Sequence, residues 1–171
     1  MKFIIVNGPS CTGKSTAVNQ VLEKFPHFYK LSYDAQKWHF SKYDRTTHFD
    51  DVHTVVRALA ETVCKLKYNI ICDSALYKKD REFLFEIVKK HGYEIVEINL
   101  EAEYEVVAKR FDERVASALA NKSKTISNTS KERFKEIYDI YQAEKNLDAI
   151  EIRTDTNTPE EVAKQMFVYC A

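Results

Sequence analysis

The sequence predicts an α/β fold, a five-stranded parallel sheet with helices on both faces, and three observations point to this class. Short apolar segments suited to buried strands alternate with segments of helical periodicity along the chain. The length of 171 residues and the 44% of hydrophobic residues are enough to bury one core. No internal repeat or dividing linker is visible, so residues 1–171 are expected to form a single domain.

The first half of the chain shows the alternation clearly. Residues 2–7 form a short apolar run typical of a strand buried on both faces. In residues 14–25, apolar side chains recur at helical spacing, and residues 28–33 follow as a second expected strand. Residues 50–67 carry one apolar face and predict a helix. The apolar segment 69–72 is the third expected strand.

The second half continues in the same way. Residues 80–90 predict a helix that ends near Gly92, because glycine is favoured just past helix ends. Residues 94–100 are the fourth expected strand, and residues 103–119 have the pattern of a long amphipathic helix.

A polar segment then interrupts the pattern. Residues 120–130 are rich in Ser, Thr and Asn, which favour loops and caps, and we interpret residues of about 115–131 as a small lid. A helix over 131–144, a fifth strand over 149–153 and a last helix capped by Thr158 complete the predicted fold.

Charge and cysteine content exclude several classes of protein. Lys plus Arg and Asp plus Glu both number 26, which argues against a generic nucleic-acid coat or a polybasic membrane binder. No apolar run approaches the roughly 20 residues that span a bilayer, so no membrane partner is expected. The cysteines form no C-x-x-C motif and no Cys/His cluster, which favours a cytoplasmic protein with free thiols.

One sequence motif indicates a binding site for phosphate groups. Gly8–Ser15 reads Gly-Pro-Ser-Cys-Thr-Gly-Lys-Ser, which matches G-x-x-x-x-G-K-[ST] between the first strand and the first helix. Only three glycines are present, and two of them lie in this loop. Backbone N–H groups of such a loop bind phosphate oxygens, helped by the helix N-terminus. The alternative is a chance match in a strand–helix turn. The residues expected to bind ATP here are Gly8, Ser10, Cys11, Thr12, Gly13, Lys14, Ser15 and Thr16.

Two carboxylates follow expected strands at the same edge of the sheet. Asp73 follows the third strand and, with the Ser15 hydroxyl, is the candidate ligand pair for Mg²⁺. Asp34 follows the second strand. The alternative for each carboxylate is the N-cap of the next helix.

These features resemble the small, AAA_33-like P-loop kinases, a group that includes gluconate kinase, chloramphenicol phosphotransferase and zeta-type toxins. The greatest similarity is to the kinase domain of phage-type 5′-hydroxyl polynucleotide kinases. The similar segments are the phosphate loop, residues 25–29, Asp34, Cys72-Asp73-Ser74 with Arg81, Lys109-Arg110 with Arg114, and residues 138–141.

The resemblance implies transfer of a phosphoryl group from ATP–Mg²⁺ to a hydroxyl. It implies that Asp34 is the general base, and that one of Arg110 and Arg114 stacks on adenine while the other contacts the transferred phosphate. The phosphate-loop motif itself predicts that Lys14 bridges the β- and γ-phosphates. The alternative for the two arginines is a solvated helix face with acidic partners.

The chain departs from these kinases at the acceptor. Polynucleotide kinases of this type carry an arginine three residues after the base, where this chain has Lys37, which cannot bind a phosphate with two parallel hydrogen bonds as arginine does. Lys37 and Trp38 are the candidate acceptor residues, although core packing is the competing interpretation for the aromatic side chains here. The expected acceptor is a nucleotide, a nucleoside or a polynucleotide 5′-hydroxyl, so nucleic acid is one acceptor class. A small-molecule kinase and an NTPase switch are the alternatives, and the oligomeric state is left open.

Overall fold

The computed structural model describes residues 1–73, 77–121 and 130–171. A sheet of five strands runs through its centre, and every neighbouring pair of strands is parallel, in the order β2-β3-β1-β4-β5. The predicted fold class is confirmed. The strands are β1 (Lys2–Asn7), β2 (Phe28–Leu31), β3 (Asn69–Cys72), β4 (Glu94–Glu101) and β5 (Ile150–Arg153).

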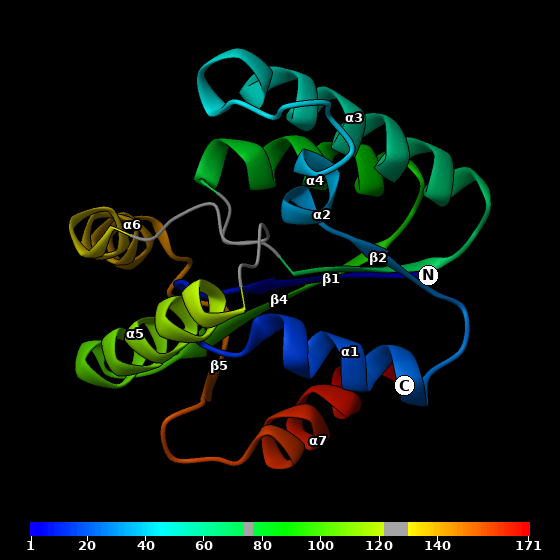
Figure 1. Cartoon of the computed structure of the whole chain (residues 1–171). Coiled ribbons are helices and arrows are strands. Elements are labelled where there is room, and N and C mark those ends of the chain that lie inside the picture. The colour runs from blue at the N-terminus through cyan, green and yellow to red at the C-terminus, as the bar shows by residue number, and fades with distance from the viewer. Residues whose placement is uncertain (74–76, 122–129) are drawn as a thin grey trace.

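Helices cover both faces of this sheet (Figure 1). The helices α1 (Lys14–Lys24) and α7 (Pro159–Cys170) lie together on one face. The opposite face carries α2 (Tyr33–Lys37), α3 (Arg45–Lys65) and α4 (Lys78–Lys90). The remaining two helices, α5 (Tyr104–Ala120) and α6 (Lys131–Glu144), pack against each other near the end of the sheet at which the strands finish.

The alternation of side chains along β1 divides the core into two layers. Phe3 and Ile5 point to the α3–α4 face, where they pack with residues such as Val56 and Leu84. Ile4 and Val6 point to the other face and pack with residues of α1 and α7. Because both faces are covered, β1 is apolar along almost its whole length, which is why the sequence signal for this strand is strong.

The segment after β2 differs from the sequence prediction. The expected strand over 28–33 is two residues too long, because the Ser32 hydroxyl accepts a hydrogen bond from the Ala35 amide and starts α2 at Tyr33. Helix α3 begins at Arg45, five residues before the predicted start. Asp44 caps it by accepting hydrogen bonds from the amides of Thr46 and Thr47.

The second half of the chain follows the prediction closely. Helix α6 has the predicted bounds, and Thr158 forms the capping box of α7 with Glu161. Of the predicted lid, residues 115–120 are the last turns of α5, and residues 122–129 lie outside the described residues. None of the described helices is long and apolar enough to cross a bilayer.

Candidate active site

The glycine-rich loop joins β1 to α1 in a conformation that its sequence requires. Gly8 has a φ of +151°, and a Cβ at this position would lie 2.6 Å from the backbone oxygen of Leu100 and 2.8 Å from the Thr12 hydroxyl. Gly13, with a φ of +84°, is the N-cap of α1. The two positions therefore need glycine for different reasons, close approach at Gly8 and a left-handed backbone at Gly13.

Lys14, the first residue of α1, folds back over this loop. Its Nζ donates hydrogen bonds of 2.8 Å to the carbonyl oxygens of Gly8 and Pro9. Burial lowers the pKa of Lys14 to about 8, and the negative charges of Asp34 and Asp73 oppose this shift only in part. An anion in the loop would raise this pKa again and stabilise the ammonium form of Lys14.

Ser15 and Asp73 lie side by side, as the prediction of a metal site requires. The Ser15 hydroxyl is 3.1 Å from Asp73 Oδ2, and the other carboxylate oxygen, Oδ1, is buried with no hydrogen-bond partner among the described residues. These oxygens suit Mg²⁺, which takes few protein ligands and completes its shell with water and phosphate. The described part of the chain has no cluster of three His, Cys, Asp or Glu side chains that could bind a metal ion.

A cavity of about 500 Å³ opens beside the loop, within the size range of small-ligand sites. Six predicted site residues line it: Ser10, Lys14, Asp34, Lys37, Trp38 and Arg114. They come from the loop, α1, α2 and α5, so the fold brings together residues that are up to 104 positions apart in the sequence. The other predicted site residues lie outside the wall of this cavity.

Asp34 lies in the first turn of α2 and forms an ion pair with Lys37, one turn further along. Loss of hydration works to raise the pKa of Asp34, but the side chain is 78% exposed, so this effect is weak, and Lys37, by charge and by hydrogen bond, together with Lys14 and Arg114, holds the pKa below the usual value. The Asp34 carboxylate is therefore ionised at neutral pH. Asp34 is not an N-cap, because Ser32 fills that position.

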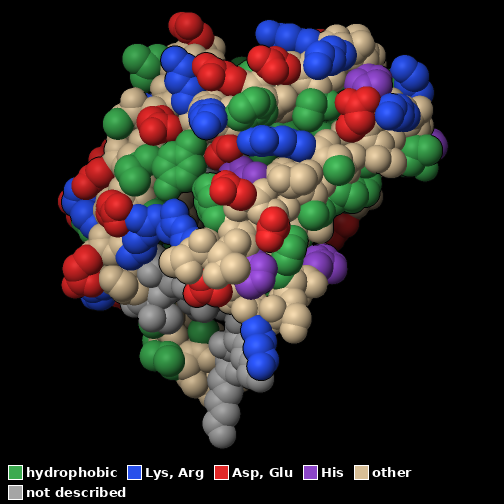
Figure 2. Space-filling model, turned by 90° about the horizontal axis from the view of Figure 1, so that it is seen from above, with side chains coloured by type: hydrophobic (Ala, Val, Ile, Leu, Met, Phe, Trp, Pro, Cys, Tyr) green, Lys and Arg blue, Asp and Glu red, His purple; other side chains and the backbone are tan. Residues whose placement is uncertain are grey.

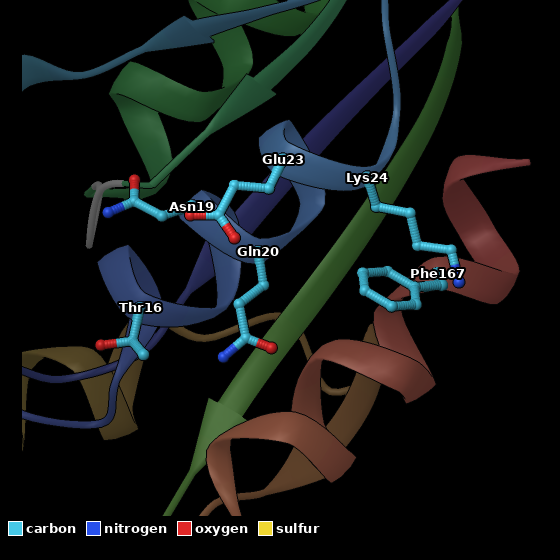
Figure 3. Close-up of a pocket in the computed structure, with 6 residues that line it drawn as sticks. All are labelled: Thr16, Asn19, Gln20, Glu23, Lys24 and Phe167. Carbon is cyan, nitrogen blue, oxygen red and sulfur yellow. The ribbon is translucent and has the colours of Figure 1, made fainter.

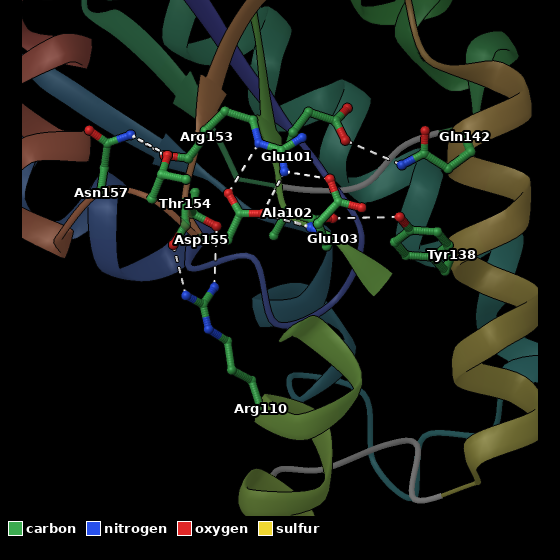
Figure 4. A network of polar contacts seen from close by, with 11 residues as sticks. Glu101, Ala102, Glu103, Arg110, Tyr138, Gln142, Arg153, Thr154, Asp155 and Asn157 are labelled. Atoms are coloured by element: carbon green, nitrogen blue, oxygen red, sulfur yellow. Dashed lines mark hydrogen bonds and ion pairs between the residues drawn. The ribbon is translucent and has the colours of Figure 1, made fainter. Parts of the chain in front are cut away.

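The two predicted arginines of α5 have different surroundings. Arg114 lines the cavity and makes no hydrogen bond or ion pair with any described residue. Arg110 instead binds Thr154, with 3.2 Å to the hydroxyl and 2.7 Å to the carbonyl oxygen (Figure 4). The acidic partners that the alternative interpretation required are not found for either arginine among the described residues, although Asp112 does pair with Lys131.

The contact of Arg110 holds the loop after β5. Arg153 pairs with Asp155, and Asp155 accepts a 2.9 Å hydrogen bond from the Glu103 amide, so this loop is connected both to α5 and to the end of β4 (Figure 4). These contacts fix the loop after β5 against α5 and the end of β4.

Thr16 faces a different hollow. It lines a shallow, open depression with residues of α1 and α7, including Lys24 and Phe167 (Figure 3). Lys24 Nζ lies 4.2 Å from the centre of the Phe167 ring, and this contact closes one side of the depression. The depression shares no lining residue with the cavity beside Asp34.

Sequence reasoning missed most of the far wall of the cavity. This wall comes from α3, the start of α4 and α6, and it includes aromatic rings and further arginines. The amphipathic pattern of residues 131–144 predicted the helix α6, but it did not indicate which face of this helix would line a ligand site. The residues are Arg45, Phe49, His53, Tyr77, Asp80, Arg133, Ile137, Ile140, Tyr141 and Glu144.

The fold and the loop together define a P-loop nucleotide-binding protein of the kinase-like kind: the glycine-rich loop follows the central strand of a parallel sheet and opens α1. The chain belongs to the AAA_33 family, an AAA domain, whose profile matches residues 3–142. A comparison with curated proteins gives no match.

Solved structures share the fold at low sequence identity. Kti12 from Chaetomium thermophilum, in complex with ADP-AlF3, is 15% identical with a TM-score of 0.69, over 99% of each chain. A sugar kinase from Janibacter sp. HTCC2649 is 19% identical with a TM-score of 0.65, over 99% of this chain and 94% of that one. A chain of the Pnkp1/Rnl/Hen1 RNA repair complex is 15% identical with a TM-score of 0.65, over 83% of this chain and 44% of that longer one.

Proposed function

We propose that the protein is an ATP-dependent kinase that transfers the γ-phosphoryl group to a hydroxyl of an acceptor bound beside Asp34. The observation that carries this proposal is the ionised Asp34 carboxylate, which shares one cavity with Lys14 and Arg114. A protein that only binds or hydrolyses a nucleotide does not need a carboxylate opposite the phosphate loop with a ligand-sized space beside it.

In the proposed reaction, the acceptor oxygen bonds to the γ-phosphorus while the bond from that phosphorus to the β–γ bridging oxygen breaks. Asp34 takes the hydroxyl proton, and ADP leaves. Lys14 and Arg114 stabilise the charge on the transferred group. Ser15 and Asp73 would hold Mg²⁺, which offsets phosphate charge when bound with ATP.

We further propose a nucleotide, a nucleoside or a polynucleotide 5′ end as the acceptor. Aromatic rings on the cavity wall, Trp38, Tyr43 and Phe49, suit a planar base. Arg45 lines the same wall, 5.7 Å from the Phe49 ring centre, and has no carboxylate partner among the described residues. It suits an acidic group of the acceptor, because Lys37 is already paired with Asp34.

The face above α3 and α4 favours an acceptor bound in the cavity rather than along an extended track on that face. Lys and Arg side chains alternate with Asp and Glu over the face above α3 and α4 (Figure 2), and the net charge is zero. A long nucleic acid held by its backbone would need a positive stripe. A short 5′ end or a mononucleotide needs only the cavity.

A small-molecule kinase is the second candidate. It is favoured by the size of the cavity, about 500 Å³, and by the buried polar groups in its wall, such as Asp80 and His53, which lie 3.0 Å apart and suit a sugar or another polyol.

The test is transfer of label from [γ-³²P]ATP to a panel of acceptors: 5′-hydroxyl oligonucleotides, nucleosides, nucleoside monophosphates and sugars. We expect a labelled nucleotide product. A labelled sugar would select the second candidate. Hydrolysis of ATP that no acceptor stimulates would contradict both kinases and favour an NTPase switch.

A further inference from the structure

The carboxylate expected at the metal site already has a cation beside it. Lys30 Nζ lies 3.0 Å from Asp73 Oδ2, the same oxygen that is 3.1 Å from the Ser15 hydroxyl. The Asp73 side chain is only 4% exposed and that of Lys30 30% exposed, so little water separates the two charges. A pair of this kind is held more firmly than an exposed ion pair on a helix surface.

The position of β2 explains why Lys30 reaches this carboxylate. β2 is the edge strand beside β3, and Lys30 lies opposite Ile71, two residues before Asp73. Leu31 packs in the core on the α3–α4 face, so its neighbour Lys30 points to the α1 face. There the Lys30 ammonium also donates a 3.1 Å hydrogen bond to Asn19 Oδ1, on α1 (Figure 3 shows Asn19).

In this arrangement, two cations would compete for the Asp73 carboxylate. A Mg²⁺ ion between Ser15 and Asp73 would share one carboxylate with the Lys30 ammonium, and like charges at such a separation repel even in a medium of high effective dielectric. The triphosphate of ATP brings enough negative charge to offset this repulsion. Without a nucleotide, Lys30 already compensates the buried carboxylate.

We propose that Lys30 is a positioning residue that acts through Asp73: it compensates this carboxylate while no nucleotide is bound, and it makes Mg²⁺ binding depend on the phosphates of ATP. The proposal rests on the proposed function for the role of Asp73 at a metal site. Its consequence is that metal and nucleotide enter together, and that the protein without a nucleotide holds Mg²⁺ weakly.

The experiment compares wild type with Lys30→Met, which keeps most of the side-chain length but removes the charge, and with Lys30→Arg, which keeps the charge. Lys90→Met is the control for a lost lysine. Lys90 ends α4, shortly before the start of β4, and so lies near the end of the sheet at which the strands begin, whereas the phosphate loop lies at the end at which they finish. Two quantities are measured: the Tm in EDTA and in rising MgCl₂ without nucleotide, and the MgCl₂ concentration that gives half-maximal binding of a fluorescent methylanthraniloyl-ATP.

We expect Lys30→Met to melt at a lower temperature than wild type in EDTA, because Asp73 stays buried without a compensating charge. MgCl₂ alone should then raise its Tm, while the Tm of wild type, Lys30→Arg and Lys90→Met should change little. The MgCl₂ concentration for half-maximal nucleotide binding should fall about three- to tenfold in Lys30→Met only, the range that the loss of one nearby like charge gives.

An equal response of wild type and Lys30→Met to MgCl₂ without nucleotide would overturn the proposal, as would a higher Mg²⁺ requirement in Lys30→Met. The melting arm does not depend on kinase activity or on the acceptor. Failure of the proposed function, seen as absence of phosphoryl transfer by wild type, is therefore distinguishable from failure of this proposal.

Discussion

Asp34 and Lys37 form an ion pair one helical turn apart on α2, at the wall of the cavity that also contains Lys14 and Arg114. The pairing connects two residues that the sequence suggested for separate tasks, one for the reaction and one for the acceptor. Because Lys37 helps to keep Asp34 ionised, its proposed effect is on the base rather than on an acceptor phosphate.

Lys37→Met should therefore change the pH dependence of transfer. Removing the positive charge lets the pKa of Asp34 rise, because Lys37 contributes to the lowered value. The base is active when ionised, so the acid limb of the kcat/KM profile should move to higher pH, with activity recovering above it. Lys37→Arg should keep the wild-type limb. An unmoved limb in Lys37→Met would show that the pair does not control the reacting group.

ATP affinity should fall as the pH rises through about 8. Burial lowers the pKa of Lys14 to about 8 in the nucleotide-free protein, and bound phosphates favour the protonated form and raise that pKa. Binding therefore takes up a proton near and above pH 8, and the association constant decreases where Lys14 must be protonated first. Titration calorimetry in buffers of different ionisation enthalpy measures this uptake. Lys14→Met should bind more weakly and show no uptake near pH 8.

Gly8→Ala should destabilise the protein by about 2–4 kcal/mol, because the new methyl group would meet the Leu100 carbonyl oxygen at 2.6 Å and the backbone would have to shift. Gly92→Ala is the matched control. Gly92 also has a positive φ, +74°, but open space around its Cβ position, so only the backbone strain of about 1 kcal/mol is expected. Urea denaturation gives both values, and equal losses would contradict the close approach at Gly8.

Substitutions of the two arginines of α5, Arg110 and Arg114, should have different kinetic effects. Arg114→Ala should reduce turnover with every acceptor and also slow background ATP hydrolysis, because it removes a charge proposed to act on the transferred phosphate. Arg110→Ala should mainly raise the KM for ATP, because Arg110 is a predicted ATP-binding residue whose loss also releases the loop after β5 that it holds through Thr154. Steady-state kinetics with ATP as the varied substrate measures both effects. If Arg110→Ala reduced turnover and Arg114→Ala raised only the KM for ATP, the proposed roles of the two arginines would be reversed.

The parts of this site that the sequence could predict are those with local signals. The phosphate loop is contiguous, and Asp73 directly follows a buried apolar strand, so both could be placed from their neighbours in the chain. The helix α2 that contains Asp34 could not be predicted, because its five residues are too few to show helical periodicity.

The parts that could not be predicted depend on tertiary packing. Lys30 contacts Asp73 only because of the register of β2 with β3. In the sequence, Lys30 precedes the apolar Leu31, which indicates the face of the sheet to which Lys30 points but not the residue that it contacts there. Arg133 and Tyr141 reach the cavity because α6 packs on α5 through Phe111 and Phe134, whose rings stack at 4.5 Å. No short-range pattern in the sequence contains that contact.

The role of Asp34 as the general base of a kinase can be measured by comparing phosphoryl transfer and ATP affinity in Asp34→Asn and wild type. The amide keeps the shape of the side chain and leaves the phosphate loop unchanged. Asp44→Asn is the matched control, because it also removes a carboxylate from the cavity wall while asparagine can still cap α3. We predict that transfer by Asp34→Asn falls about 10²- to 10⁴-fold, the usual effect of a positioned base, while ATP affinity stays within a few-fold and Asp44→Asn keeps most of its activity. Retained transfer together with weakened ATP binding in Asp34→Asn would show that Asp34 is not the base and make it part of the nucleotide site.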